Sequence, residues 1–252
     1  GEARIEGRFR TPPEIGRRTP FHFVITGDTQ HEPARIQMVA AGILREMPAF
    51  VLHTGDLSND TRNWDLLGAE FFEPWRELLR HTTLWTARGN HEYGLEPYAS
   101  VFGISPAVPW YSFDYGNLHV VVLDQWNVSG SERMEPERRT AMAEWLERDL
   151  VGARPRADWI IVAGHQPMFN VAAHGSEWGR ETILPILYRH GVDIVIGGHS
   201  HLYERFIPIA PSGAHPIHFL VAGGGGAITY PPVPSPLLAR VHAAPHYCLF
   251  RV

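Results

Sequence analysis

The chain has 252 residues, 44% of them hydrophobic and 19% charged, a composition typical of a globular protein with a sizeable buried core. Its formal net charge is −5, and nucleic-acid binding through counterion release requires clustered basic side chains, so we expect no nucleic-acid partner. All 22 basic residues are arginine, which excludes both the phosphate-binding lysine of P-loop proteins and a Schiff-base lysine.

Further classes of protein are excluded by single residues and short motifs. Cys248 is the only cysteine, so an internal disulfide cannot form and no cysteine cluster can bind zinc. The G-x-S-x-G motif of serine hydrolases is absent. No run of about 18 apolar residues occurs, and we therefore expect no membrane span.

The expected elements alternate between strands and helices. Residues 1–20 are expected to form a loose lead-in, and residues 110–125 two strands joined by a hairpin turn at Tyr115-Gly116-Asn117, which makes the sheet mixed. Apolar runs predict the other strands over 21–28, 49–57, 82–90, 158–164, 192–198, 218–224 and 247–252, and helical patterns cover 34–46, 64–80, 136–150 and 178–190.

The remaining segment, residues 223–245, is rich in glycine and proline and is expected to form surface loops. Neither a linker nor an internal repeat interrupts the pattern, so we expect a single α/β domain over residues 1–252.

Metal-ligating residue types follow the ends of the expected strands. Four strands end in a glycine followed at once by Asp28, Asp56, Asn90 or His165, and a fifth ends in Gly198-His199-Ser200-His201. Ligands bind beyond the carboxyl ends of strands in open α/β sheets, and glycine permits the sharp turn there. Carboxylate, amide and imidazole groups suit divalent Mn, Fe or Zn, and an aspartate can bridge two ions. The pattern therefore predicts a centre with two metal ions.

These motifs resemble, in order, those of the calcineurin-like metallophosphoesterases: G-D twice, then G-N-H-E, G-H and G-H-x-H, from Gly27 to His201. Within that superfamily, GNHE at 89–92, YSFDYGNLHVVVLD at 111–124, GHQPMF at 164–169, GHSHLYER at 198–205 and AGGGG at 222–226 are most similar to the purple acid phosphatase branch. The resemblance implies a four-layer α/β/β/α fold, a β-sandwich of two mixed sheets flanked by helices.

The resemblance also implies a role for each matching residue. Asp28 and His201 would hold the first metal, Asp56 would bridge, and Asn90, His165 and His199 would hold the second. His91 is then free to meet the substrate, and His174 resembles a histidine of that branch that contacts the phosphoryl group or the leaving oxygen.

Two departures from the family pattern fall on the first metal. Asn59 stands where purple acid phosphatases have a tyrosine that stabilises ferric iron, so two divalent ions are the better prediction. Other members of the superfamily have a histidine two residues after the first aspartate, where this chain has Gln30, followed by His31. Gln30 through its carbonyl oxygen, His31 or a water molecule could complete this site.

We therefore expect hydrolysis of a small-molecule phosphate ester, above all a monoester, with metal-activated water attacking phosphorus and His91 protonating the leaving oxygen. A phosphodiesterase or a nucleotide hydrolase would use the same centre. A metal-bearing scaffold without turnover is the alternative from another class, whereas a mononuclear zinc hydrolase would leave Asp28 unexplained. The chain begins at Gly1, and because related bacterial proteins are often exported we expect export with a signal segment removed. The sequence does not determine the oligomeric state.

Residues near the motifs carry further expectations. Arg88 and Arg205 are expected to pair with Glu92 and Glu204, their neighbours in the sequence, rather than with phosphate. Trp126 and Trp178 lie near the site-bearing segments and are candidates for the wall of a substrate pocket. His22, His53 and His119, which lie in strand-like runs, are assigned to packing or solvent.

Overall fold

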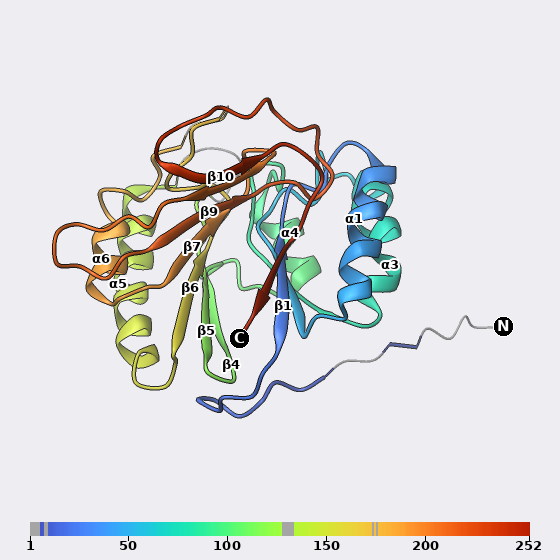
Figure 1. The fold of residues 1–252 in the computed structure, drawn as a ribbon. Helices are drawn as coiled ribbons and strands as arrows, with labels where there is room; N and C mark the ends of the chain where they lie inside the picture. The colour runs from blue at the N-terminus through green and yellow to red at the C-terminus, as the bar shows by residue number, and fades with distance from the viewer. Residues whose placement is uncertain (1–5, 8–9, 128–133, 173, 175) are drawn as a thin grey trace.

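Two β-sheets face each other and helices cover both outer surfaces (Figure 1), so the expectation of two mixed sheets flanked by helices is confirmed. The computed structural model describes residues 6–7, 10–127, 134–172, 174 and 176–252. Residues 1–5 and 8–9 of the expected lead-in lie outside this range. Within it, Gly16 donates a hydrogen bond to the carbonyl of Gly116, and Arg18 forms an ion pair with Asp158. The lead-in therefore packs against the hairpin turn at Gly116 and the segment at Asp158.

The smaller sheet has four strands in the order β11-β1-β2-β3: Cys248–Arg251, His22–Thr26, Phe50–His53 and Thr83–Thr86. β1, β2 and β3 are parallel, and β11 is antiparallel to β1. Its outer surface is covered by α1 (Pro33–Glu46), α3 (Glu73–Leu79) and α4 (Leu95–Phe102). Successive residues of a strand point to opposite faces, so Val24 packs against these helices while Phe23 and Ile25 face the other sheet.

The larger sheet has seven strands in the order β10-β8-β9-β7-β6-β5-β4: Leu238–His242, Tyr203–Phe206, His218–Ala222, Ile194–Gly197, Trp159–Ala163, Leu118–Val122 and Tyr111–Tyr115. The neighbours β5, β6, β7 and β9 run parallel, and the outer pairs are antiparallel. Helices α5 (Pro136–Ala153) and α6 (Leu184–Arg189) cover its outer surface through residues such as Leu146 and Leu187.

Several boundaries differ from those expected. The helix expected over 64–80 is divided into α2 (Trp64–Leu67), a π-helical segment (Gly68–Phe72) and α3. The helix expected over 178–190 is reduced to α6, because Gly179 adopts a φ of 77° and residues 178–183 form turns. The short elements α4 and β8 were not expected from the sequence.

The expectation of surface loops throughout residues 223–245 is wrong in two respects. Residues 238–242 form β10, which pairs with β8 at the edge of the larger sheet. Gly223, Gly224, Gly225 and Gly226 are buried: Gly223 and Gly225 pack against the loop that carries Asp28, Gly224 against His246 and Gly226 against Ile36. None of the helices in the described part of the chain combines the length and the apolar character that crossing a membrane requires.

Candidate metal centre

The polar residues predicted from the strand ends converge at one edge of the two sheets. Asp28 follows β1, Asp56 follows β2, Asn90 follows β3, His165 follows β6, and His199 and His201 follow β7. Their donor atoms form two groups, Asp56 with His165 and His199, and Asp28 with Asp56 and His201, each within 4.8 Å. Asp56 belongs to both groups, which is the position that a bridging carboxylate requires.

The group around His165 brings four potential metal-ligand atoms together. Nε2 of His165 lies 3.3 Å from a carboxylate oxygen of Asp56, 3.0 Å from Oδ1 of Asn90 and 3.1 Å from Nδ1 of His199. Nδ1 of His165 donates to the carbonyl of Thr54 at 2.8 Å, which leaves Nε2 as the nitrogen that can bind a metal ion when it is deprotonated. Carboxylate, amide and imidazole atoms gathered in this way are the donor set that a divalent cation needs, so these residues fit a metal ion.

The second group has the same character. Nδ1 of His201 donates to the carbonyl of Ile228 at 2.9 Å, and Nε2 lies 3.5 Å from Oδ1 of Asp28. The amide nitrogen of Gln30 lies 3.3 Å from Nε2 of His201 and 3.4 Å from Asp56, while its buried Oε1 finds no hydrogen-bond partner among the described residues. Turning the amide by 180° would bring Oε1 to this group. His31 is exposed, and its ring centroid lies 6.1 Å from that of His201.

The buried carboxylates of the cluster favour binding of a cation. Asp28 and Asp56 are 0% and 1% exposed, and burial raises the pKa of Asp28 well above its usual value. Burial also acts on Asp56, but its interactions with His165 outweigh it and lower the pKa of Asp56. Burial disfavours the charged imidazole, yet the charge of Asp56 raises the pKa of His165 to about 9.

The other two histidines behave differently. Burial lowers the pKa of His199 to about 3 and that of His201 to about 4, so both rings are neutral and keep the lone pairs that a metal ligand needs.

Three of the candidate ligands carry backbone strain. Asp28, Asp56 and His199 have φ values of 61°, 57° and 66°, in the left-handed region that residues other than glycine rarely occupy. The glycines that precede the candidate ligands allow neighbouring loops to pack closely. A Cβ on Gly89 would lie 2.1 Å from Oδ1 of Asp56, so this glycine permits close approach of two loops. Of these glycines, only Gly55 both permits close approach and adopts a positive φ, of 98°.

Buried carboxylates hold the loops in place. Glu92 is fully buried and accepts hydrogen bonds from the backbone N–H groups of Asp56 and Leu57, both at 2.9 Å, and from that of Gly89. The expected pair between Arg88 and Glu92 is therefore wrong, because the carboxylate of Glu92 is occupied by backbone donors. Arg88 instead pairs with Asp124 at 2.8 Å, and each side chain is 1% exposed.

The expected pair between Arg205 and Glu204 is wrong for a similar reason. Glu204 accepts hydrogen bonds from the backbone N–H groups of Val171 and Ala172, at 3.2 and 3.1 Å, and so holds the segment that leads to His174.

His91 and His174 lie at the rim of the centre. The backbone N–H of His91 donates to Oδ1 of Asp56 at 2.9 Å, and its Nδ1 donates to the carbonyl of Asn59 at 2.8 Å, which leaves Nε2 of this half-buried ring without a hydrogen-bond partner among the described residues. His174 is exposed, and its ring centroid lies 5.2 Å from that of His199. Nε2 of His174 is 2.8 Å from the hydroxyl of Tyr230, whose ring stacks on His201 at 4.8 Å.

Tyr230 could not be recognised from the sequence, because it lies in the glycine- and proline-rich segment and belongs to no motif. The two tryptophans separate: the ring of Trp126 lies 6.1 Å from that of His165, whereas Trp178 packs against the outer core of the larger sheet. The side chain of Asn59 donates to Glu70 at 2.6 Å, so this residue is committed to a structural hydrogen bond.

A family model described as calcineurin-like phosphoesterase matches residues 21–203, which include every candidate ligand from Asp28 to His201. The chain belongs to the calcineurin-like phosphoesterase family. Within this family, the chain is 30% identical over 248 residues to purple acid phosphatase 21 of Arabidopsis thaliana, covering 88% of this chain and 53% of that protein.

The fold of this calcineurin-like phosphoesterase is shared with solved structures. It is similar to a purple acid phosphatase from yellow lupin (Lupinus luteus) seeds, with a TM-score of 0.78 and 21% identity over 97% of this chain and 51% of that chain. It is also similar to GAP50 of Plasmodium, described as the anchor in the inner membrane complex, with a TM-score of 0.74 and 17% identity over 92% of this chain and 81% of that chain. The chain spans about half the length of the curated relatives it matches.

Proposed function

We propose that the protein is a hydrolase of phosphate esters, monoesters above all, that holds two divalent ions between Asp28, Asp56, Asn90, His165, His199 and His201. The observation that carries the proposal is the pair of ligand groups that share Asp56, in which carboxylate and imidazole ligand atoms lie within 4.8 Å of one another. The family gives the proposal its chemical class, and Oε1 of Gln30, with the amide turned by 180°, would supply a further oxygen for the first ion.

Two bound ions of Mn, Fe or Zn would supply a water molecule of lowered pKa and would neutralise the phosphoryl oxygens. The chain itself orients these ligands. Thr54 and Ile228 accept the Nδ1 protons of His165 and His201 and thereby aim both Nε2 atoms inward. Asp28 is oriented by the backbone N–H of His199, at 2.9 Å from Oδ1.

His91 is the proposed general acid. Its backbone is anchored to Asp56 and its Nδ1 to Asn59, so the ring is fixed beside the bridging carboxylate with Nε2 free to carry a proton. A histidine in this position can deliver that proton to the leaving oxygen of a bound ester. The hydroxyl of Tyr230 holds His174 beside His199, where His174 would contact the phosphoryl group.

Metal content and turnover test the proposal together. Elemental analysis is expected to find about two ions per chain, with hydrolysis of p-nitrophenyl phosphate faster than that of bis-p-nitrophenyl phosphate after addition of Mn, Zn or Fe. Asp56→Asn should lose both metal and turnover, whereas Asp65→Asn, the same change at an exposed position in α2, should retain both. Protein that carries no metal would contradict the ligand assignment. A preference for the diester would favour a phosphodiesterase or nucleotide hydrolase.

A second experiment tests His91 separately. His91→Ala is expected to keep the metal and to lose turnover by about 100-fold or more with a poor leaving group such as phenyl phosphate, and by much less with p-nitrophenyl phosphate. An equal loss with both esters would show that His91 does not act as the acid.

A metal-bearing scaffold is the second candidate, and Gln30 is the observation that favours it. An amide stands where other members of the superfamily have a histidine, and neutral amide oxygen is a weaker ligand than imidazole for Zn or Fe. Protein that binds metal and phosphate but hydrolyses neither ester would support this function.

A further inference from the structure

A second concave surface lies between the two sheets, away from the candidate metal centre. The larger sheet has seven strands and the smaller has four, and β11 is the smaller sheet's edge strand on this side. The inner surface of β9, β8 and β10 therefore extends beyond β11 (Figure 1). The space between them forms a cavity of about 770 Å³, within the range of about 300–1,000 Å³ typical of small-molecule sites. We call it the inter-sheet cavity.

The lining of the inter-sheet cavity includes none of the candidate metal ligands. Much of it is apolar. Ile194 and Leu220 on the larger sheet and Cys248 and Phe250 on β11 belong to, or pack against, the core between the sheets. An apolar body entering this space would be removed from water along both walls.

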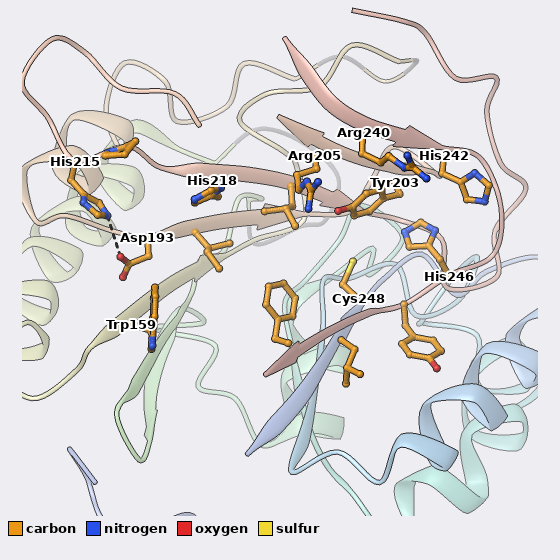
Figure 2. A pocket seen from close by; sticks show the side chains of 16 residues that line it. Trp159, Asp193, Tyr203, Arg205, His215, His218, Arg240, His242, His246 and Cys248 are labelled. Atoms are coloured by element: carbon orange, nitrogen blue, oxygen red, sulfur yellow. Dashed lines mark hydrogen bonds and ion pairs between the residues drawn. The ribbon is translucent and has the colours of Figure 1, made fainter. Parts of the chain in front are cut away.

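The polar residues of the lining are segregated. Figure 2 shows Arg205, Arg240 and His242 at one end of the inter-sheet cavity and Asp193 with His215 at the other. Asp193 is the only acidic residue of the lining, and its carboxylate is already engaged, with Arg154 at 3.2 Å and His215 at 3.1 Å. No acidic side chain of the cavity lining therefore neutralises the positive charge of Arg205 and Arg240.

The two arginines are opposed to each other. Arg240 on β10 lies directly across the antiparallel ladder from Arg205 on β8, and like charges in this position destabilise a sheet. Both residues are exposed, and within the described residues neither guanidinium forms an ion pair with a carboxylate. An anion placed between them would turn this repulsion into two charge-assisted interactions.

We propose that the inter-sheet cavity binds a small amphipathic anion with a fatty-acid-like shape. Its carboxylate or phosphate-type head lies between Arg205 and Arg240, and its apolar body lies along Leu220 and β11. The guanidinium groups provide planar sets of donors for the anionic oxygens, and the apolar walls select a ligand with a hydrocarbon chain or ring. This site is independent of the phosphoesterase centre.

Titration calorimetry with decanoate, decyl phosphonate and decanol tests the proposal and identifies the head group. At least one of the two anions is expected to bind at least about tenfold more tightly than decanol, which has the same chain without the charge. Arg205→Gln and Arg240→Gln should each weaken that binding by about 10- to 100-fold. Arg251→Gln, the same change on β11 outside the lining, should leave it unchanged.

Thermal unfolding without ligand separates ligand binding from a structural role of the arginines. Arg240→Gln removes the repulsion from Arg205, so its midpoint should equal that of the native protein or exceed it by about 1–3 °C. The proposal is overturned if none of the three compounds binds, if decanol binds as tightly as both anions, or if both arginine variants bind like the native protein. It is also overturned if sedimentation shows self-association that covers the cavity and blocks both anions.

Discussion

Replacing Glu92 by alanine tests whether this buried carboxylate holds together the two loops that carry the candidate ligands Asp56 and Asn90. Its Oε2 accepts hydrogen bonds from the backbone N–H groups of Asp56 and Gly89, and its Oε1 from that of Leu57. Each buried donor left without a partner costs about 1–3 kcal/mol, so three donors cost about 3–9 kcal/mol. Water entering the space would recover part of this, and we expect a loss of about 3 kcal/mol or more in the free energy of unfolding.

Glu92→Gln provides a graded comparison. Its remaining oxygen can serve the donors of Asp56 and Gly89, while its amide group would face the N–H of Leu57 and leave that one donor unpaired. The expected loss is therefore about 1–3 kcal/mol. Burial, with a further contribution from Asp56, raises the pKa of Glu92 to about 7. Ionisation of Glu92 therefore lowers the stability of the native protein between about pH 4.3 and that value, and the deficit of the neutral variant should be largest below this window.

Urea unfolding in the presence of a chelator measures these losses without a contribution from bound metal. Glu96→Ala, at an exposed position in the first turn of α4, is the matched control and should stay within about 0.5 kcal/mol of the native protein. The reasoning fails if Glu92→Ala unfolds within about 1 kcal/mol of the native protein, or if the glutamine and alanine variants are equally unstable.

Two further predictions follow from buried charges. His119 is hydrogen-bonded to Asp114 and to Asp149, both at 2.8 Å; burial lowers its pKa, but the two carboxylates outweigh burial and raise it. A raised folded-state pKa stabilises the protein fully below the unfolded value of about 6.5, and this contribution disappears as the pH rises through the folded value. In denaturant unfolding, the deficit of His119→Gln should be about 1–3 kcal/mol at pH 5.5 and smaller at pH 9, and a deficit independent of pH would contradict the argument. Asp28→Asn removes a buried carboxylate whose pKa is raised by burial, so it should stabilise the metal-free protein by about 1–3 kcal/mol while lowering metal content. Thermal scans with and without chelator measure this, and a variant less stable than the native metal-free protein would refute it.

The layers of the fold were predictable because strand and helix patterns in this sequence are strong. Val24 and Val51 face one layer of helices, while Phe23 and Leu52 face the other sheet, an alternation that follows from strand geometry alone. The short elements were missed. α4 has only eight residues between Gly94 and Gly103, and β10 lies in a segment whose prolines indicated loops.

The candidate ligands could be placed because each follows a strand directly, and strand ends meet at a common edge. The residues that support them could not be placed in this way. Glu92 binds the loop at Asp56, 36 positions away, and Tyr230 meets His174 across 56 positions. Contacts between distant segments leave no local pattern. The sequence therefore suggests a pair between Arg88 and its neighbour Glu92, whereas Arg88 pairs with Asp124 in the structure.

The strain at Asp28, Asp56 and His199 has a structural cause that bears on how the centre is built. A residue other than glycine in the left-handed region costs on the order of 1–3 kcal/mol, and such conformations persist only where neighbouring groups determine them. Here the loops hold one another: the N–H of Asp28 donates to the carbonyl of Gly55 at 2.9 Å, and the N–H of His199 donates to the carboxylate of Asp28. The ligand positions are thus set by hydrogen bonds within the chain. Bound ions would meet a prearranged set of donors and would offset the charge that burial makes unfavourable.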